Sequence, residues 1–219
     1  MKLEKENLCK YINSLRPNLK EDIKILKNKA LENDIPIIKN SAEDFLKLIF
    51  RLSNFYNKKV NILEVGAAVC YSTIFMADIL QNSTITTIER DEKRIKLAKE
   101  NLKKFNYDIS LIEGDAFEEI KKLVEDNKKY DLIFLDSAKS TYNRLLPNLL
   151  KLMDKDSILL ADNVLHDSYI IKSKYAINRR NITINQEMRK FLYNITHSDY
   201  LESYIFDISD GMSISIKKK

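Results

Sequence analysis

Glycine and proline are scarce in this chain of 219 residues, which contains only three of each. Flexible linkers and disordered tails are rich in these residues, so their scarcity argues against both. The hydrophobic fraction of 44% is ordinary for a globular protein. A chain of this length can bury a core that needs no disulfide or metal to hold it together.

Cysteine is rare as well, and Cys9 and Cys70 are the only two. Two cysteines are typical of reduced thiols in a reducing compartment. The sequence also lacks any run close to the ~20 apolar residues of a membrane-spanning helix. Its first 15 residues alternate charged and apolar side chains, which is not typical of a secretion signal. We therefore expect a cytoplasmic protein that has no membrane partner.

The excess of positive charge is small, with a net charge of +5. A dedicated nucleic-acid binder is usually more basic, and most of these charges fit a solvated surface of lysine and glutamate. The balance still leaves room for a polyanionic substrate.

The spacing of apolar residues changes near residue 58. Before it, residues 18–33 and 42–56 have the spacing of helices. After it, short apolar runs alternate with helical stretches. The predicted strands are 60–65, 84–88, 109–112, 131–135 and 157–161, and the predicted helices between them are 72–81, 91–105, 116–126 and 141–153. This alternation predicts a parallel sheet with helices on both faces.

The last part of the chain has a different pattern. A predicted helix at 184–196 precedes two strands, 201–207 and 212–217, which are joined by a turn at Ser209-Asp210-Gly211. Such a hairpin makes one of the final strands antiparallel. We predict an α/β fold with a doubly wound, mostly parallel seven-stranded sheet. We expect one domain over residues 1–219, with an N-terminal helical part (1–57) and an α/β core (58–219). The amphipathic N-terminal helices are suited to pairing two subunits, so we also expect a homodimer.

Acidic residues stand at four successive exits of the predicted strands. Open α/β sheets bind ligands outside the carboxyl ends of their strands. The residues at these ends are Gly66, Glu89, Asp115, Asp136, Asp162 and Asn163. A purely structural domain has no need of four acidic groups in these positions, so they indicate a ligand site.

The first of these positions suit a nucleoside. Gly66 lets the chain turn sharply and lie close to a ligand, and Glu89 is suited to holding the two hydroxyls of a ribose. Ser72, at the start of the next helix, can cap that helix or bind the ligand, and Asp115 can likewise act as an N-cap or as part of the site. A backbone N–H at Ala116 can meet an adenine ring nitrogen.

The first loop, GAAVCYS, contains a single glycine. A nicotinamide dinucleotide requires G-x-G-x-x-G, which seats its pyrophosphate on a helix N-terminus. A nicotinamide-dependent oxidoreductase is therefore the disfavoured alternative.

Oxygen ligands gather at the fourth and fifth predicted strands. If these strands are neighbours, Asp136, Asp162 and Asn163 converge, and they offer the ligands that Mg²⁺, Mn²⁺ or Ca²⁺ prefer over zinc. A bound divalent cation lowers the pKa of a hydroxyl that it contacts. Lys139, three residues after Asp136, can accept the proton of that hydroxyl or stabilise its oxyanion.

Six segments of the chain follow one another in a specific order: ILEVGAAVCYST, TTIERD, EGDAF, LIFLDSAKSTY, LLADNVL and SDGMSISIK. Together they resemble the metal-dependent O-methyltransferases, the family of the catechol and caffeoyl-coenzyme A enzymes. The resemblance implies a class I, Rossmann-like methyltransferase fold and S-adenosyl-L-methionine as cofactor. It implies that Asp136, Asp162 and Asn163 hold the cation and that Lys139, with Asp136, is catalytic. The implied cofactor contacts are Ile38, Gly66, Ser72, Glu89, Asp115, Ala116 and Asp136.

One residue departs from the family pattern. Where a second glycine is common in the first loop, this chain has Cys70. We expect its side chain to be accommodated near the methionine end of the cofactor.

The resemblance also points to a substrate. The segments KYAINRRNITI and DISDGMSISIK look most like a bacterial branch that methylates the wobble 5-hydroxyuridine of transfer RNA to 5-methoxyuridine. Arginine and lysine bind phosphate and release counterions from RNA, so the basic stretch after the metal loop is expected to contact the anticodon. Its candidate residues are Lys172, Lys174, Arg179 and Arg180. The alternative is a small catechol-like or phenolic hydroxyl substrate, which needs no basic rim.

Overall fold

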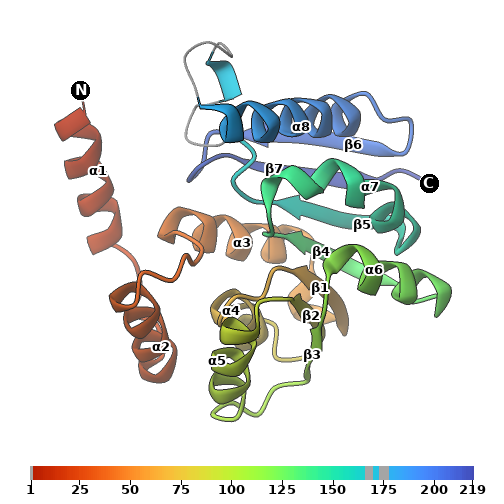
Figure 1. Cartoon of the computed structure of the whole chain (residues 1–219). Coiled ribbons are helices and arrows are strands. Elements are labelled where there is room, and N and C mark those ends of the chain that lie inside the picture. The colour runs from red at the N-terminus through yellow and green to blue at the C-terminus, as the bar shows by residue number, and fades with distance from the viewer. Residues whose placement is uncertain (1, 166–169, 173–177) are drawn as a thin grey trace.

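The computed structural model describes residues 2–165, 170–172 and 178–219, with the side chains of all of these except residues 2–6, 179 and 180. Seven strands form one sheet in the order β3-β2-β1-β4-β5-β7-β6 (Figure 1). Strands β1 to β5 pair in parallel, and β7 is antiparallel to both β5 and β6. The predicted mostly parallel sheet with an antiparallel final strand is confirmed. The strands are β1 (Val60–Val65), β2 (Ser83–Glu89), β3 (Ile109–Glu113), β4 (Tyr130–Leu135), β5 (Met153–Ala161), β6 (Leu201–Phe206) and β7 (Met212–Lys217).

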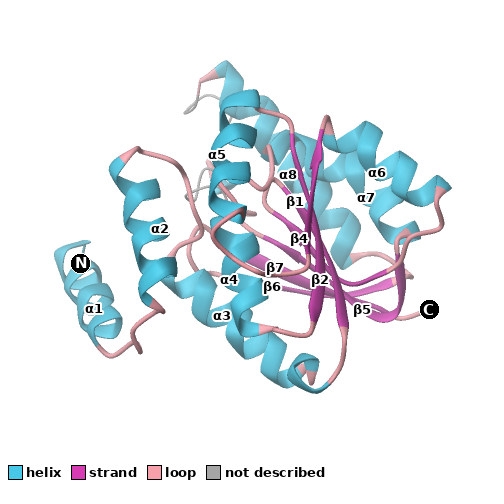
Figure 2. Ribbon diagram, turned by 90° about the horizontal axis from the view of Figure 1, so that it is seen from below, coloured by secondary structure: helices cyan, strands magenta, loops and turns pink. Residues whose placement is uncertain are grey.

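Helices cover both faces of the sheet (Figure 2). One apolar cluster joins the sheet to α2, α3, α4 and α5, and a second joins its other face to α6, α7 and α8. The helices that precede the sheet are α1 (Lys2–Ser14), α2 (Glu21–Glu32), α3 (Asn40–Leu52) and the 3-10 turn η1 (Phe55–Asn57). Those that follow β1 are α4 (Tyr71–Ile79), α5 (Glu92–Leu102), α6 (Ala116–Glu125), η2 (Lys139–Thr141), α7 (Tyr142–Lys151) and α8 (Arg179–Thr196).

The strands at the centre of the sheet are buried on both sides. In β1, Ile62, Leu63 and Val65 are all fully buried, as expected for a parallel strand that helices cover on both faces. The chain leaves β1 towards β2 on one side, and β4 pairs with the other side. The strand order therefore runs outward in opposite directions from the boundary between β1 and β4. Open α/β sheets bind their ligands at such a switch point.

Several element boundaries differ from the sequence prediction, among them the end of α3, which stops at Leu52 and not at residue 56, and the starts of β5 and α8. Strand β5 begins at Met153, four residues before the predicted start, because a register irregularity opposite Tyr130 and Leu132 lets it pair further back. Helix α8 begins at Arg179, where the side chain of Asn178 accepts a hydrogen bond from Asn181 N at 2.9 Å and caps the helix. In the described part of the chain, no helix has the length and apolar character needed to cross a membrane.

Candidate active site

The turn after β1 brings two strand exits into contact. Gly66 has φ +105°, and a Cβ atom built on it would lie 2.1 Å from the carbonyl oxygen of Asp136. The left-handed conformation and the lack of space both require glycine here. The exit of β4 is joined to that of β1 by a hydrogen bond from Asp136 N to Val65 O, 3.0 Å long. The predicted role of Gly66 in a tight turn at the ligand edge is therefore seen in the backbone.

Glu89 ends β2 and is held by the backbone. Its Oε2 atom accepts a hydrogen bond from Ala68 N at 2.8 Å, and its Oε1 atom accepts from Arg90 N at 2.8 Å and Asp91 N at 3.0 Å. Three N–H donors fix the orientation of the carboxylate. A fixed acceptor at this edge of the sheet suits the predicted contact with a ribose diol.

Ser72 has a different partner from the ones expected. Its hydroxyl donates to Glu64 Oε1 at 2.5 Å, and no side chain caps helix α4. Glu64 also accepts from the hydroxyls of Thr73 and Thr87, and it is fully buried. Burial raises the pKa of Glu64, and the three hydroxyl donors oppose that rise. Sequence reasoning missed Glu64, although a lone acidic residue inside the apolar run of β1 is a signal for it.

Asp115 is the N-cap of α6. Its Oδ1 atom accepts from Phe117 N at 3.0 Å, and its other oxygen pairs with Arg90 at 3.2 Å. Ala116 is the first residue of the helix, and the first N–H groups of a helix have no partner within it. The predicted N-cap is confirmed, and Ala116 lines the cavity, where its contact with an adenine ring stays a prediction.

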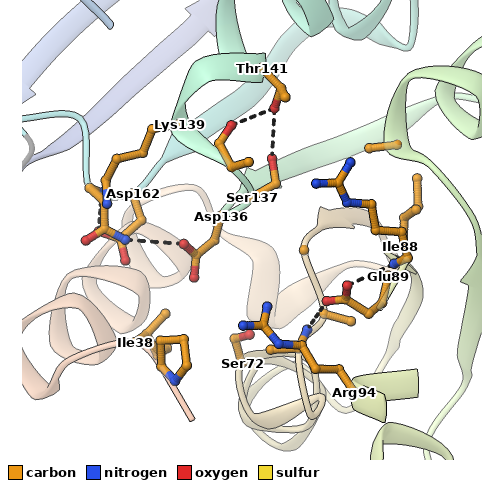
Figure 3. A pocket seen from close by; sticks show the side chains of 18 of the residues that line it. Ile38, Ser72, Ile88, Glu89, Arg94, Asp136, Ser137, Lys139, Thr141 and Asp162 are labelled. Atoms are coloured by element: carbon orange, nitrogen blue, oxygen red, sulfur yellow. Dashed lines mark hydrogen bonds between the residues drawn. The ribbon is translucent and has the colours of Figure 1, made fainter. Parts of the chain in front are cut away.

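The exits of β4 and β5 bring Asp136, Asp162 and Asn163 together, as predicted. Asn163 Nδ2 donates to Asp136 Oδ1 at 3.3 Å, and Asn163 N donates to Asp162 Oδ1 at 2.7 Å. Figure 3 shows Asp136 and Asp162 on one side of a cavity, with Glu89 across from them. Burial, and then repulsion from neighbouring carboxylates, raises the pKa of both Asp136 and Asp162. Asn163 has φ +60°, a left-handed conformation that asparagine tolerates better than most residues.

Lys139 and Tyr142 follow β4 closely. Lys139 begins η2 and lies beside Asp162 in Figure 3, where its charge favours the ionised forms of Asp136 and Asp162. The hydroxyl of buried Tyr142 lies 3.0 Å from Leu135 O and 3.1 Å from Asp162 O, so it ties the two exits together. The sequence analysis did not identify Tyr142, because only the fold brings its hydroxyl to these carbonyl groups.

One cavity of about 920 Å³ joins these groups. Among the predicted site residues, those that line it are Ile38, Gly66, Ser72, Glu89, Asp115, Ala116, Asp136, Lys139, Asp162 and Asn163. Ile38 lies in the loop before α3 and is 3% exposed. No group of three or more His, Cys, Asp and Glu side chains in the described ranges is arranged to hold a metal. The candidate cation set is accordingly two carboxylates and one amide.

Of the four predicted RNA-binding residues, the structure describes the side chain of Lys172 alone. Lys172 is exposed, lies outside the cavity lining, and accepts a hydrogen bond from Arg189 at its carbonyl oxygen, 3.2 Å long. Lys174 and the side chains of Arg179 and Arg180 lie outside the described residues.

The expectation for Cys70 is wrong. Its φ of +62° is the left-handed conformation that favours glycine, yet its side chain packs into the apolar core and not into the cavity. Burial raises the pKa of the Cys70 thiol to about 12. The loop backbone at Cys70 keeps the left-handed conformation typical of glycine, and the side chain is buried in the core instead of lining the cavity.

Comparison with known proteins identifies the family of the chain. The O-methyltransferase family profile matches residues 13–218. The chain is 29% identical over 172 residues to a catechol O-methyltransferase of Niastella koreensis, covering 76% of each chain. It is 25% identical over 224 residues to a putative caffeoyl-CoA O-methyltransferase of Arabidopsis thaliana, covering 97% of this chain and 94% of the other.

Solved structures share the whole architecture. A putative caffeoyl-CoA O-methyltransferase from Staphylococcus aureus superposes with a TM-score of 0.82 and 29% identity, over 98% of this chain and 99% of the other. An O-methyltransferase from Bacillus cereus, solved in complex with S-adenosylhomocysteine, has a TM-score of 0.81 and 21% identity, over 95% and 96% of the two chains.

The sheet order and the ligand edge define a class I methyltransferase fold. The chain belongs to the O-methyltransferase family and is an S-adenosylmethionine-dependent O-methyltransferase of the catechol and caffeoyl-CoA type.

Proposed function

We propose that this enzyme methylates a hydroxyl of a small catechol-like or phenolic substrate and uses a divalent cation to do so. The observation that carries the proposal is the meeting of Asp136, Asp162, Asn163 and Lys139 at one side of the cavity that also contains Glu89. The similarity to catechol and caffeoyl-CoA enzymes supports this class of substrate.

The residues present fit a divalent cation. Two buried carboxylates beside each other repel, and a cation between them would relieve both that repulsion and the cost of burying them. The amide nitrogen of Asn163 donates to Asp136, which leaves its carbonyl oxygen available as a third ligand. Oxygen ligands alone suit Mg²⁺, Mn²⁺ or Ca²⁺. When bound, such a cation makes a hydroxyl more acidic.

The residues of the cavity have separate roles in methyl transfer. Glu89 and the N–H of Ala116 orient the adenosine, and Gly66 allows the methionine end to approach the sheet edge. S-adenosylmethionine supplies an electrophilic methyl group on its sulfonium. Lys139 either accepts the proton of the substrate hydroxyl or stabilises the resulting oxyanion. The oxygen forms its bond to the methyl carbon as the carbon–sulfur bond breaks, and the protein contributes mainly by positioning the reacting groups.

Methylation of a catechol in the presence and absence of free cation tests this proposal. We expect purified enzyme, 3,4-dihydroxybenzoate and S-adenosylmethionine to yield a monomethyl ether and S-adenosylhomocysteine when Mg²⁺ is present. EDTA should abolish turnover, and excess Mg²⁺ should restore it. Turnover that persists in EDTA would remove the cation from the reaction. A Lys139→Ala variant should lose turnover and still bind S-adenosylhomocysteine.

The wobble 5-hydroxyuridine of transfer RNA is the second candidate substrate. The observation that favours it is the basic stretch that contains Lys172, Lys174, Arg179 and Arg180, shortly after Asn163. An extruded anticodon base could present its 5-hydroxyl at the same site.

Mass spectrometry of anticodon nucleosides separates the two substrates. If transfer RNA is the substrate, 5-hydroxyuridine accumulates in a deletion strain and purified enzyme converts it to 5-methoxyuridine. The Arg179→Ala/Arg180→Ala variant should then lose transfer RNA methylation in a salt-dependent way. If RNA is left unmethylated while the catechol is methylated, the RNA assignment fails.

A further inference from the structure

Arg94 lines the catalytic cavity from the side of α5. It lies in the first turn of that helix, where its backbone N–H donates to Asp91 Oδ1 at 3.0 Å. Its side chain is exposed, and Figure 3 shows it directed into the cavity, towards Ser72. A guanidinium has five N–H donors and no acceptor, so one that points into a ligand cavity suits an anionic group.

The position of Arg94 is fixed by the packing of α5 on the loop that follows β1. Asn101 is buried on the same helix, and its Nδ2 atom donates to Val69 O at 3.0 Å. Arg94 and Asn101 are separated by about two helical turns, so their side chains leave the same side of α5. The side of the helix that holds the loop is therefore the side that carries Arg94.

The other four cations of the cavity lining each lie near an acidic group. They are Lys39 with Asp210 at 2.6 Å, Arg90 with Asp115 at 3.2 Å, Arg144 with Asp115 at 4.0 Å, and Lys139 with Asp136 and Asp162. Within the described part of the chain, the guanidinium of Arg94 has no hydrogen bond or ion pair. Glu89 lies in the same cavity, but its two oxygens already accept from three backbone N–H groups. Of these five cations, Arg94 is the one whose donors are left for a ligand.

We propose that Arg94 binds the carboxylate at the methionine end of S-adenosylmethionine. The cofactor carries two positive groups, its sulfonium and its ammonium, and one negative group, its α-carboxylate. Adenine and ribose are uncharged, so the carboxylate is the part of the cofactor that a guanidinium attracts. The planar fork of an arginine can donate to both carboxylate oxygens at once. The proposal rests on the class of enzyme and not on the substrate or the cation proposed above.

The donors available near Ser72 support this assignment. Ser72 is the second residue of α4 and lines the cavity, so its hydroxyl is a candidate donor to the carboxylate. That hydroxyl has a single proton, which it donates to Glu64 Oε1 at 2.5 Å. An anion that approaches Ser72 therefore needs a donor from another element, and Arg94 points to this place from α5.

Calorimetric titration with two ligands tests the contact. S-adenosylhomocysteine has the carboxylate, whereas S-(5′-adenosyl)-3-thiopropylamine lacks it and is otherwise the same. We expect Arg94→Ala to raise the dissociation constant of S-adenosylhomocysteine about tenfold. The same change should leave the dissociation constant of the amine within about twofold, and the difference between the two ligands isolates the contact. The variant should fold normally, because the Arg94 side chain is exposed and its N–H keeps the bond to Asp91.

Three further variants complete the test. Lys93→Ala removes the same charge from the neighbouring residue, which is exposed and lies outside the cavity lining, and it should bind both ligands as the wild type does. Glu89→Gln should weaken both ligands by the same factor, because both contain the ribose. Arg94→Glu repels a carboxylate and attracts an ammonium, so it should bind the amine more tightly than S-adenosylhomocysteine.

Three results would overturn the proposal, and none of them depends on turnover. Unchanged affinity of Arg94→Ala for S-adenosylhomocysteine would show that Arg94 does not contact the cofactor. An equal loss of affinity for both ligands would assign the effect to the adenosine end or to the fold. An equal loss in Lys93→Ala would make it a general effect of surface charge. The catechol and EDTA assays are independent of these titrations, so failure here and failure of the proposed function are distinguishable.

Discussion

Replacing Glu89 by glutamine removes a charge and leaves the size of the side chain unchanged. Its two carboxylate oxygens accept hydrogen bonds from three backbone N–H groups, those of Ala68, Arg90 and Asp91. A glutamine has one acceptor oxygen, so its NH₂ group must face either Ala68 N or the other two donors. At least one of these N–H groups then loses its acceptor, and a hydrogen bond to a charged group contributes about 1.5–3 kcal/mol.

The same charge is proposed to hold the ribose of the cofactor. Loss of a charge-assisted contact to a ribose hydroxyl should weaken binding of S-adenosylhomocysteine by about 1–3 kcal/mol. Since about 1.4 kcal/mol corresponds to a tenfold change, the dissociation constant should rise by roughly 5- to 150-fold. Isothermal titration calorimetry measures this directly, and thermal melting reports the loss of stability.

Glu113→Gln is the matched control. Glu113 lies opposite Glu89 in the register of β2 and β3, but its side chain is 47% exposed and pairs with Lys99 at the surface. An exposed ion pair is worth about 0–1 kcal/mol, so this variant should bind S-adenosylhomocysteine as the wild type does. If Glu89→Gln and Glu113→Gln have the same affinity as the wild type, Glu89 does not hold the ribose.

Three further changes test other parts of the site. Asp162→Ala and Asn163→Ala should each abolish turnover and leave binding of S-adenosylhomocysteine largely intact, because these side chains lie on the side of the cavity that is proposed to hold the cation; calorimetry showing a large loss of affinity would contradict this. Tyr142→Phe keeps the ring packed on Phe191 but removes the hydroxyl that donates to Asp162 O, while Leu135 O keeps its hydrogen bond from Asp162 N at 3.0 Å. It should lower the free energy of unfolding by about 1–3 kcal/mol and weaken activation by Mg²⁺ about tenfold, whereas Tyr193→Phe at an exposed position should do neither. In a Cys9→Ser background, Cys70 should not react with a disulfide reagent at pH 8, because burial raises the pKa of its thiol to about 12 and the thiolate is nearly absent; one thiol should appear on unfolding, and rapid reaction of the native protein would show that the loop opens.

The order of strands and helices was predictable because it rests on local spacing. Parallel strands buried on both faces are continuous apolar runs, and β1 (Val60–Val65) matches its predicted strand at both ends. The acidic residues at the strand exits were predictable for the same reason, since each exit directly follows an apolar run. Once β4 and β5 are neighbours, the parallel register places Asp136 beside Asp162.

Groups that act across the fold were not predictable from local spacing. Glu64 accepts from Ser72, Thr73 and Thr87, and only the packing of α4 and β2 on β1 brings these hydroxyls to it. The side chain of Cys70 points into the core because the loop takes a left-handed turn, and the identity of the residue says nothing about that direction.

The sequence by itself determined the class of fold and the edge of the sheet where ligands bind, because burial and strand ends are properties of consecutive residues. The tertiary structure decided the partners of the polar groups. Tyr142 reaches two strand exits, and Arg16 attaches α1 to a buried carboxylate on α3. Such contacts join residues far apart in the chain, and their distances are set only when all the layers pack together.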